Sequence, residues 1–135
     1  MSRILLDTSA YSEILRGDVR IARAMQEADE IAVNAIVLGE LKAGFSRGRH
    51  RERNERELAE FLASPRVHVL VIDGETADRY AFILNSLRSA GTPIPTNDAW
   101  IAAGAMQHGL RVVTTDQHFR EVSQILVDWF GRGET

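Results

Sequence analysis

Four acidic residues have the types and positions that could bind a metal ion. Asp7 and Asp116 each come directly after a short apolar run typical of a strand. Asp98 opens an apolar helix, and Glu40 lies at the margin of the apolar face of another helix. Carboxylates that converge raise one another's pKa unless a cation neutralises them. Because four separate elements would bring these acids to one edge of a sheet, we expect them to share a cation.

The ligand chemistry favours Mg²⁺ or Mn²⁺ in octahedral geometry. The chain has no cysteine, and its four histidines form no close ligand pair in the sequence, so zinc is disfavoured. A bound ion of this kind activates a water molecule and neutralises charge on a phosphoryl oxygen. The expected reaction is therefore hydrolysis of a phosphodiester bond, with the hydroxyls of Ser9 and Thr115 supporting the carboxylates or metal-bound waters.

Each acid also has an ordinary structural role open to it. Asp7 and Asp116 are suited to cap turns and the helices that follow them. Asp98 would complement the positive end of its helix dipole, and Glu40 alone would suit a solvated rim. Ser9 and Thr115 are equally suited to turns. The shared site is preferred because no lysine or arginine next to these acids in the sequence would pair with them.

The elements that must position these residues alternate between strand-like and helical patterns. This alternation predicts an α/β fold, a Rossmann-like α/β/α sandwich around a mainly parallel sheet of four to five strands. In such a sheet, polar residues at the carboxyl ends of the strands form the site. The pattern predicts strands at 4–6, 31–33, 67–72, 110–114 and 125–127, and helices at 8–16, 19–28, 35–45, 50–62, 76–90, 97–108 and 117–121.

Length and composition are consistent with one domain spanning residues 1–135. The absence of cysteine excludes disulfides and indicates a cytoplasmic protein. No apolar stretch approaches membrane-spanning length, so we expect no membrane association. The formal net charge of −3 argues weakly against a nucleic-acid partner. That objection weakens once the four acids are assigned to a metal site, because the rest of the chain is weakly basic.

Three segments together resemble the PIN-domain proteins, specifically the VapC toxins of bacterial toxin–antitoxin pairs. They are LLDTSAYSEILRGD, IVLGELKAGFSRG and PIPTNDAWIAAGAMQHGLRVVTTDQHF. The resemblance covers essentially the whole chain and implies a PIN-domain fold and a metal-dependent endoribonuclease. It assigns metal binding and catalysis to Asp7, Glu40, Asp98 and Asp116. Family members differ near the last strand, so the number of metal ions stays open.

The resemblance also implies partners. These are an RNA substrate, a small VapB-like antitoxin that covers the acidic cleft and neutralises the toxin, and a second copy of the chain in a homodimer. The alternative is a PIN-fold module that dimerises or binds RNA with little or no catalysis. A phosphoacceptor receiver domain fits less well, because such a domain needs a lysine after a late strand, whereas the only lysine is Lys42.

An arginine-rich tract follows the Glu40 helix, with five arginines between Arg47 and Arg56. Arg47, Arg49 and His50 are candidates to bind RNA phosphates, although the resemblance implies that the antitoxin also contacts this region. The helix at 50–62 itself is expected to be a solvated face held by ion pairs four residues apart. These pairs are Arg51/Glu55, Glu52/Arg56, Arg53/Glu57 and Arg56/Glu60.

Two further side chains are expected to have ordinary roles. Trp100 lies inside the apolar helix and is expected in the core. His118 follows Asp116 closely enough to act in proton transfer, but a surface position on a short helix is preferred.

Overall fold

The computed structural model describes residues 2–131. Its centre is a five-stranded sheet in which every pairing is parallel, with the strand order β3-β2-β1-β4-β5. The α/β fold and the parallel sheet predicted from the sequence are confirmed. The strands are β1 (Arg3–Leu6), β2 (Glu30–Asn34), β3 (Val67–Leu70), β4 (Arg111–Thr114) and β5 (Val127–Trp129).

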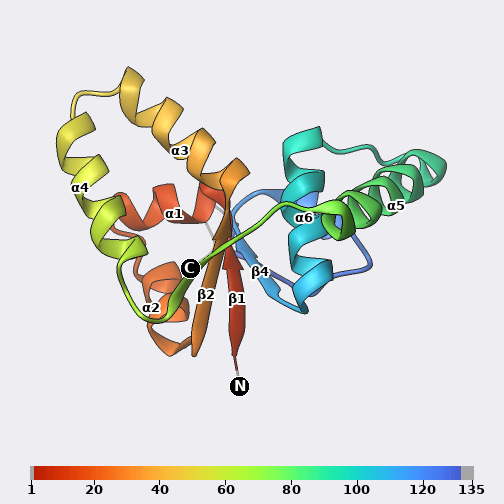
Figure 1. Ribbon diagram of the computed structural model, residues 1–135, viewed down its shortest axis with the longest axis horizontal. Helices are drawn as coiled ribbons and strands as arrows, with labels where there is room; N and C mark the ends of the chain where they lie inside the picture. Colours follow the sequence, from red (N-terminus) through yellow and green to blue (C-terminus); the bar gives the residue numbers. More distant parts are fainter. Residues whose placement is uncertain (1, 132–135) are drawn as a thin grey trace.

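Helices cover the sheet from both sides. In Figure 1, α1 to α4 lie to the left of the labelled strands, and α5 and α6 lie to the right. A short 3₁₀ helix, η1, follows β4. The helices are α1 (Thr8–Leu15), α2 (Val19–Glu27), α3 (Ala35–Arg47), α4 (Arg51–Leu62), α5 (Gly74–Ala90), α6 (Thr96–His108) and η1 (Gln117–Glu121).

Two strands differ from their predicted bounds by two residues, and the other three differ by one residue at one or both ends. The last strand is Val127–Trp129 rather than 125–127, because β4 pairs in a register that sets Val112 opposite Val127. The third strand ends at Leu70 rather than at residue 72. The two residues after Leu70 leave the sheet and lead to Asp73, whose side chain caps α5 through the backbone N–H of Thr76.

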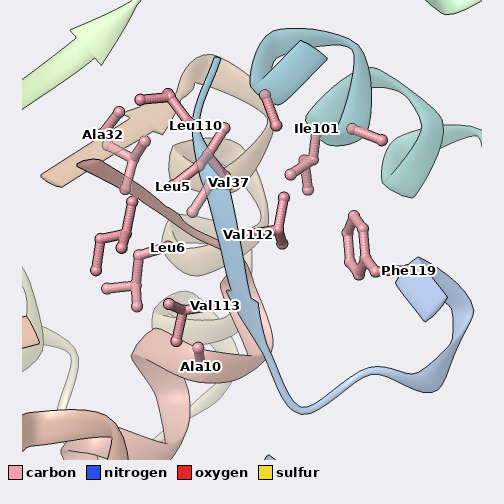
Figure 2. Packing of buried hydrophobic residues seen from close by; sticks show 14 of the residues in the cluster. Leu5, Leu6, Ala10, Ala32, Val37, Ile101, Leu110, Val112, Val113 and Phe119 are labelled. Carbon is pink, nitrogen blue, oxygen red and sulfur yellow. The ribbon is translucent and has the colours of Figure 1, made fainter. Parts of the chain in front are cut away.

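The core is built by the alternation of side chains along the central strands. In Figure 2, Val112 of β4 lies on the side of Ile101 and Phe119, whereas Val113 lies near Ala10 on the other side. All five of these side chains are 1% exposed or less. Strands β1 and β4 are therefore held from both faces, which fixes the positions of the residues that follow them.

The start of α6 is set by its neighbours in sequence. Helix α5 ends at Ala90 and is capped by Gly91, whose φ of 76° suits a residue without a side chain. Pro93 and Pro95 then form a loop that returns the chain to the carboxyl edge of the sheet, where α6 begins at Thr96. Among the described residues, no helix is both long and apolar enough to cross a bilayer.

Candidate active site

Asp7 is the most firmly held of the four acids. Its Oδ1 accepts hydrogen bonds from the backbone N–H of Ala10 and the hydroxyl of Ser9, both at 2.9 Å. Its Oδ2 accepts a 2.7 Å bond from the hydroxyl of Thr114. Burial raises the pKa of Asp7 to about 6, against the lowering effect of these bonds. Asp7 therefore caps α1 and also presents a fixed carboxylate at the end of β1.

Glu40 is tied to two other elements of the site. Its Oε1 accepts a 2.6 Å hydrogen bond from the hydroxyl of Thr8 at the start of α1. Its Oε2 accepts a 3.4 Å bond from the side-chain amide of Asn97 in the first turn of α6. The carboxylate is half-buried. It is thus held between helices, which a freely solvated rim residue would not be.

Asp98 and Asp116 are joined by a side-chain hydrogen bond. Asp98 lies in the first turn of α6, and Asp116 caps η1 after β4. Desolvation raises the pKa of Asp98 to about 8, and a side-chain hydrogen bond with Asp116 and the negative charges of Asp116, Asp7 and Glu40 add to this rise. The four acids therefore interact electrostatically as one cluster.

His118 belongs to the same cluster, although its side chain is 46% exposed. Its Nδ1 lies 2.9 Å from Oδ1 of Asp116 and 3.5 Å from Oδ2 of Asp98. The predicted surface position on a short helix is confirmed, and the ring also approaches the site, which was the alternative considered for it. The sequence feature that indicates this contact is the separation of only two residues between His118 and Asp116. The 3₁₀ turn brings the two residues together, and the backbone N–H of His118 donates to Asp116 at 2.9 Å.

The supporting hydroxyls are only partly those that were expected. Ser9 donates to Asp7, as predicted. From β4, however, the hydroxyl that binds Asp7 is that of Thr114, whereas Thr115 contributes its backbone N–H to Ser9 Oγ at 3.1 Å. Within residues 2–131 the Thr115 hydroxyl donates to no carboxylate, because Thr115 lies in the bend beyond β4, so that part of the expectation was wrong. Its expected role toward metal-bound waters stays a prediction.

The donor set fits a hard divalent cation. Within residues 2–131, none of the four acids forms an ion pair with a lysine or arginine, and the imidazole of His118 lies beside Asp98 and Asp116. One ligand atom from each of Asp98, Asp116 and His118 lies within 4.8 Å of the other two. Carboxylate oxygens with a single imidazole suit Mg²⁺ or Mn²⁺. Positive charge here would relieve the repulsion that adds to the effect of burial on the pKa of Asp98.

A hollow of about 370 Å³ extends from Thr8 and Glu40 between α1, α3 and α4. Its lining includes three basic side chains, Arg16, His50 and Arg53. Of the predicted phosphate-binding candidates, only His50 lines it, whereas Arg47 and Arg49 are exposed outside it. Arg16 and Arg53 were missed because the sequence does not show which side of a helix faces a neighbouring helix.

Two expectations about neighbouring helices were wrong. None of the four ion pairs expected along α4 forms in the described part of the chain, and Glu55 instead binds Lys42 of α3 at 3.0 Å. Trp100 is half-buried rather than in the core. Its ring stacks on that of Tyr80 from α5, with centroids 3.9 Å apart and planes at 12°. This stack holds α6 two residues after Asp98.

Comparisons with known proteins agree with this geometry. The PIN domain family model matches residues 4–125. Ribonuclease VapC4 of Mycobacterium tuberculosis is 32% identical over 130 residues, which cover 93% of this chain and 95% of that protein. Toxin FitB of Neisseria gonorrhoeae is 32% identical over 124 residues, covering 84% and 87%.

Solved structures show the same likeness. A chain of DNA-bound VapBC from Salmonella typhimurium superposes with a TM-score of 0.81 at 27% identity, covering 95% of this chain and 98% of that one. The residues that the family model matches, 4–125, contain all four clustered acids and the whole of β2, β3 and β4. The chain therefore belongs to the PIN-domain family, among proteins of the VapC type.

Proposed function

We propose that this protein is a metal-dependent endoribonuclease toxin that a cognate antitoxin neutralises. The observation that carries the proposal is the convergence of Asp7, Glu40, Asp98 and Asp116 from four elements, with no lysine or arginine paired to any of them within residues 2–131. The relatives named ribonucleases and toxins support the substrate class and the biological role.

Asp7, Glu40, Asp98 and Asp116 would hold Mg²⁺ or Mn²⁺, which supplies a water molecule of lowered pKa and neutralises charge on a phosphoryl oxygen. Asp7 provides a fixed oxygen because three donors hold it. Glu40 is oriented by Thr8. Asp98 keeps its proton up to about pH 8 when no cation is bound. It is therefore the carboxyl group whose charge changes most when a cation binds at neutral pH.

The basic hollow supports a path for the RNA backbone. Arg16, His50 and Arg53 line the same hollow as Glu40, so phosphates bound there would lie next to the acidic cluster. A second hollow of about 430 Å³ is lined by Ser9, Thr115 and Arg16 among others. Arg16 lines both hollows and would contact phosphates bound in either of them.

The partner proposals follow from the relatives. Structures of VapBC and FitAB complexes are among the structural neighbours, and these support an antitoxin as the protein that restrains this chain. The proposed substrate and partner are consistent with a cytoplasmic location. The homodimer implied by the resemblance stays a prediction, as does a single domain spanning residues 1–135.

The test is RNA cleavage by the purified protein in Mg²⁺, in Mn²⁺ and in chelator. Cleavage is expected with either ion and lost in chelator, in Asp7→Asn and in Asp98→Asn. The control is Asp78→Asn, which changes an exposed acid on α5 and should cleave normally. Cleavage that persists in chelator or in both site variants would contradict the proposal. RNA binding without any cleavage by the unmodified protein would favour the non-catalytic PIN module.

A further inference from the structure

The imidazole of His118 has no role in the proposal above, yet it lies inside the acidic cluster. Its Nδ1 is 2.9 Å from an oxygen of Asp116 and 3.5 Å from an oxygen of Asp98. The ring is positioned by η1: Asp116 caps this helix through the backbone N–H of His118, and the next residue, Phe119, is fully buried. The fold thus directs Nδ1 toward the two carboxylates.

These separations match donors that share one ion. Adjacent ligands of an octahedral ion, each about 2.1 Å from it, lie about 3 Å apart, and opposite ligands lie about 4.2 Å apart. The distances from Nδ1 to the two carboxylate oxygens fall within this span. The same nitrogen therefore faces both acids, as a ligand of a shared ion would.

We propose that Nδ1 of His118 is a direct ligand of the cation held by Asp98 and Asp116, so that the site prefers Mn²⁺ over Mg²⁺. This inference rests on the proposed metal-dependent function and specifies its cofactor. Mg²⁺ takes oxygen ligands and retains its waters, whereas imidazole favours ions of the first transition series. One nitrogen ligand among carboxylates would therefore make the site bind Mn²⁺ more tightly than Mg²⁺.

Binding of the cation by His118 requires a neutral ring. Nδ1 can bind a cation only without a proton, so the ring in the metal-bound site is neutral and carries its proton on Nε2. A proton present on Nδ1 is released to solvent when the ion binds. With His118 neutral and both carboxylates charged, these three groups together bring two negative charges to a divalent ion.

Mn²⁺ provides a direct readout that does not depend on RNA cleavage. Pulsed electron paramagnetic resonance of Mn²⁺ bound to the full-length protein should show coupling to a directly bound ¹⁴N nucleus. This coupling should be lost in His118→Ala and kept in His50→Ala, the control for a histidine on the neighbouring hollow. In His118→Ala the affinity for Mn²⁺ should fall by at least the roughly 10-fold that even outer-shell partners are worth, and that for Mg²⁺ much less.

Two results would overturn the inference in different ways. If Mn²⁺ binds one site per chain but shows no nitrogen coupling, or if the coupling survives in His118→Ala, His118 is not a ligand and the metal-dependent function still stands. If neither Mn²⁺ nor Mg²⁺ binds to the unmodified protein by calorimetry, the proposed metal site itself fails. A circular dichroism spectrum shared by His118→Ala and the unmodified protein excludes misfolding as the cause.

Discussion

Thr114 donates its hydroxyl hydrogen to Oδ2 of Asp7 at 2.7 Å, so the end of β4 holds the carboxylate that follows β1. Both residues are buried, with 0% and 3% of their surface exposed. The bond joins neighbouring parallel strands that are already in register, Leu6 lying opposite Val113. The sheet thereby fixes an active-site oxygen directly, without an intervening loop.

Thr114→Val removes this bond while keeping the shape of the side chain. We expect a loss of about 1–3 kcal/mol in the free energy of unfolding, because a buried carboxylate loses a donor. We also expect slower RNA cleavage, since Asp7 is then less firmly oriented. Denaturant unfolding and cleavage assays measure the two effects. Thr114→Ser keeps the hydroxyl and should recover most of both; equal loss in both variants would contradict this role.

The pKa of Asp98 predicts how stability depends on pH in the metal-free protein. The folded state keeps the Asp98 proton up to about pH 8, whereas the unfolded chain releases it near 3.8. Between these values the folded state binds more protons, so the free energy of unfolding falls as pH rises. Asp7, with a pKa of about 6, adds to the fall over the lower part of this range.

Asp98→Asn should flatten this dependence, because the amide does not titrate. Unfolding in chelator at pH 4.5, 6 and 8 should show a smaller loss of stability in Asp98→Asn than in the unmodified protein, and a more stable variant at pH 8. Asp78→Asn should keep the original slope. Equal slopes in all three proteins would show that Asp98 does not carry the raised pKa.

The basic hollow predicts which arginines affect RNA binding. Arg53→Gln removes a charge from its lining and should raise KM with little change in kcat. The slope of RNA affinity against salt concentration should also decrease by the contribution of about one phosphate contact. Arg51→Gln lies on the same helix outside the lining and is the matched control. Identical KM values for the two variants would exclude the hollow as the RNA path.

The stack of Trp100 on Tyr80 predicts a link between helix packing and the site. Trp100→Leu keeps an apolar side chain but removes the ring contact, which should cost about 1 kcal/mol of stability. Because α6 carries Asp98, affinity for Mn²⁺ should fall as well, by less than in Asp98→Asn. Denaturant unfolding measures the change in stability, and metal titration measures the change in affinity for Mn²⁺. Weaker stability with unchanged metal affinity would show that the stack supports the fold alone.

The sheet and the four acids were predictable because each depends on a local pattern. Apolar runs alternating with helical periods indicate a parallel sheet, and carboxylates that directly follow strands must meet at its carboxyl edge. Asp7 and Asp116 follow this rule, and the structure places both beside Asp98. Capping, the alternative considered for these two, is present as well, and the same side chains do both.

The features that the sequence analysis did not predict depend on contacts between residues, which the pattern of residue types along the chain does not specify. The hydroxyl that reaches Asp7 belongs to Thr114, the last residue of β4, whereas Thr115 lies in the bend beyond the strand. His118 enters the site through the tight turn of η1, which hydrophobic periodicity does not reveal. The exposed charges of α4 have several partners in reach, and Glu55 binds Lys42 of another helix.

The most direct test of the central claim is the fate of water oxygen during RNA cleavage in H₂¹⁸O with Mn²⁺. Hydrolysis at the carboxylate site predicts one ¹⁸O in the terminal phosphate of the products, no 2′,3′-cyclic phosphate at any time, and no products with Asp98→Asn. Mass spectrometry of the fragments resolves these outcomes. Cyclic phosphate ends, or labelled products that form equally well with Asp98→Asn, would contradict the account.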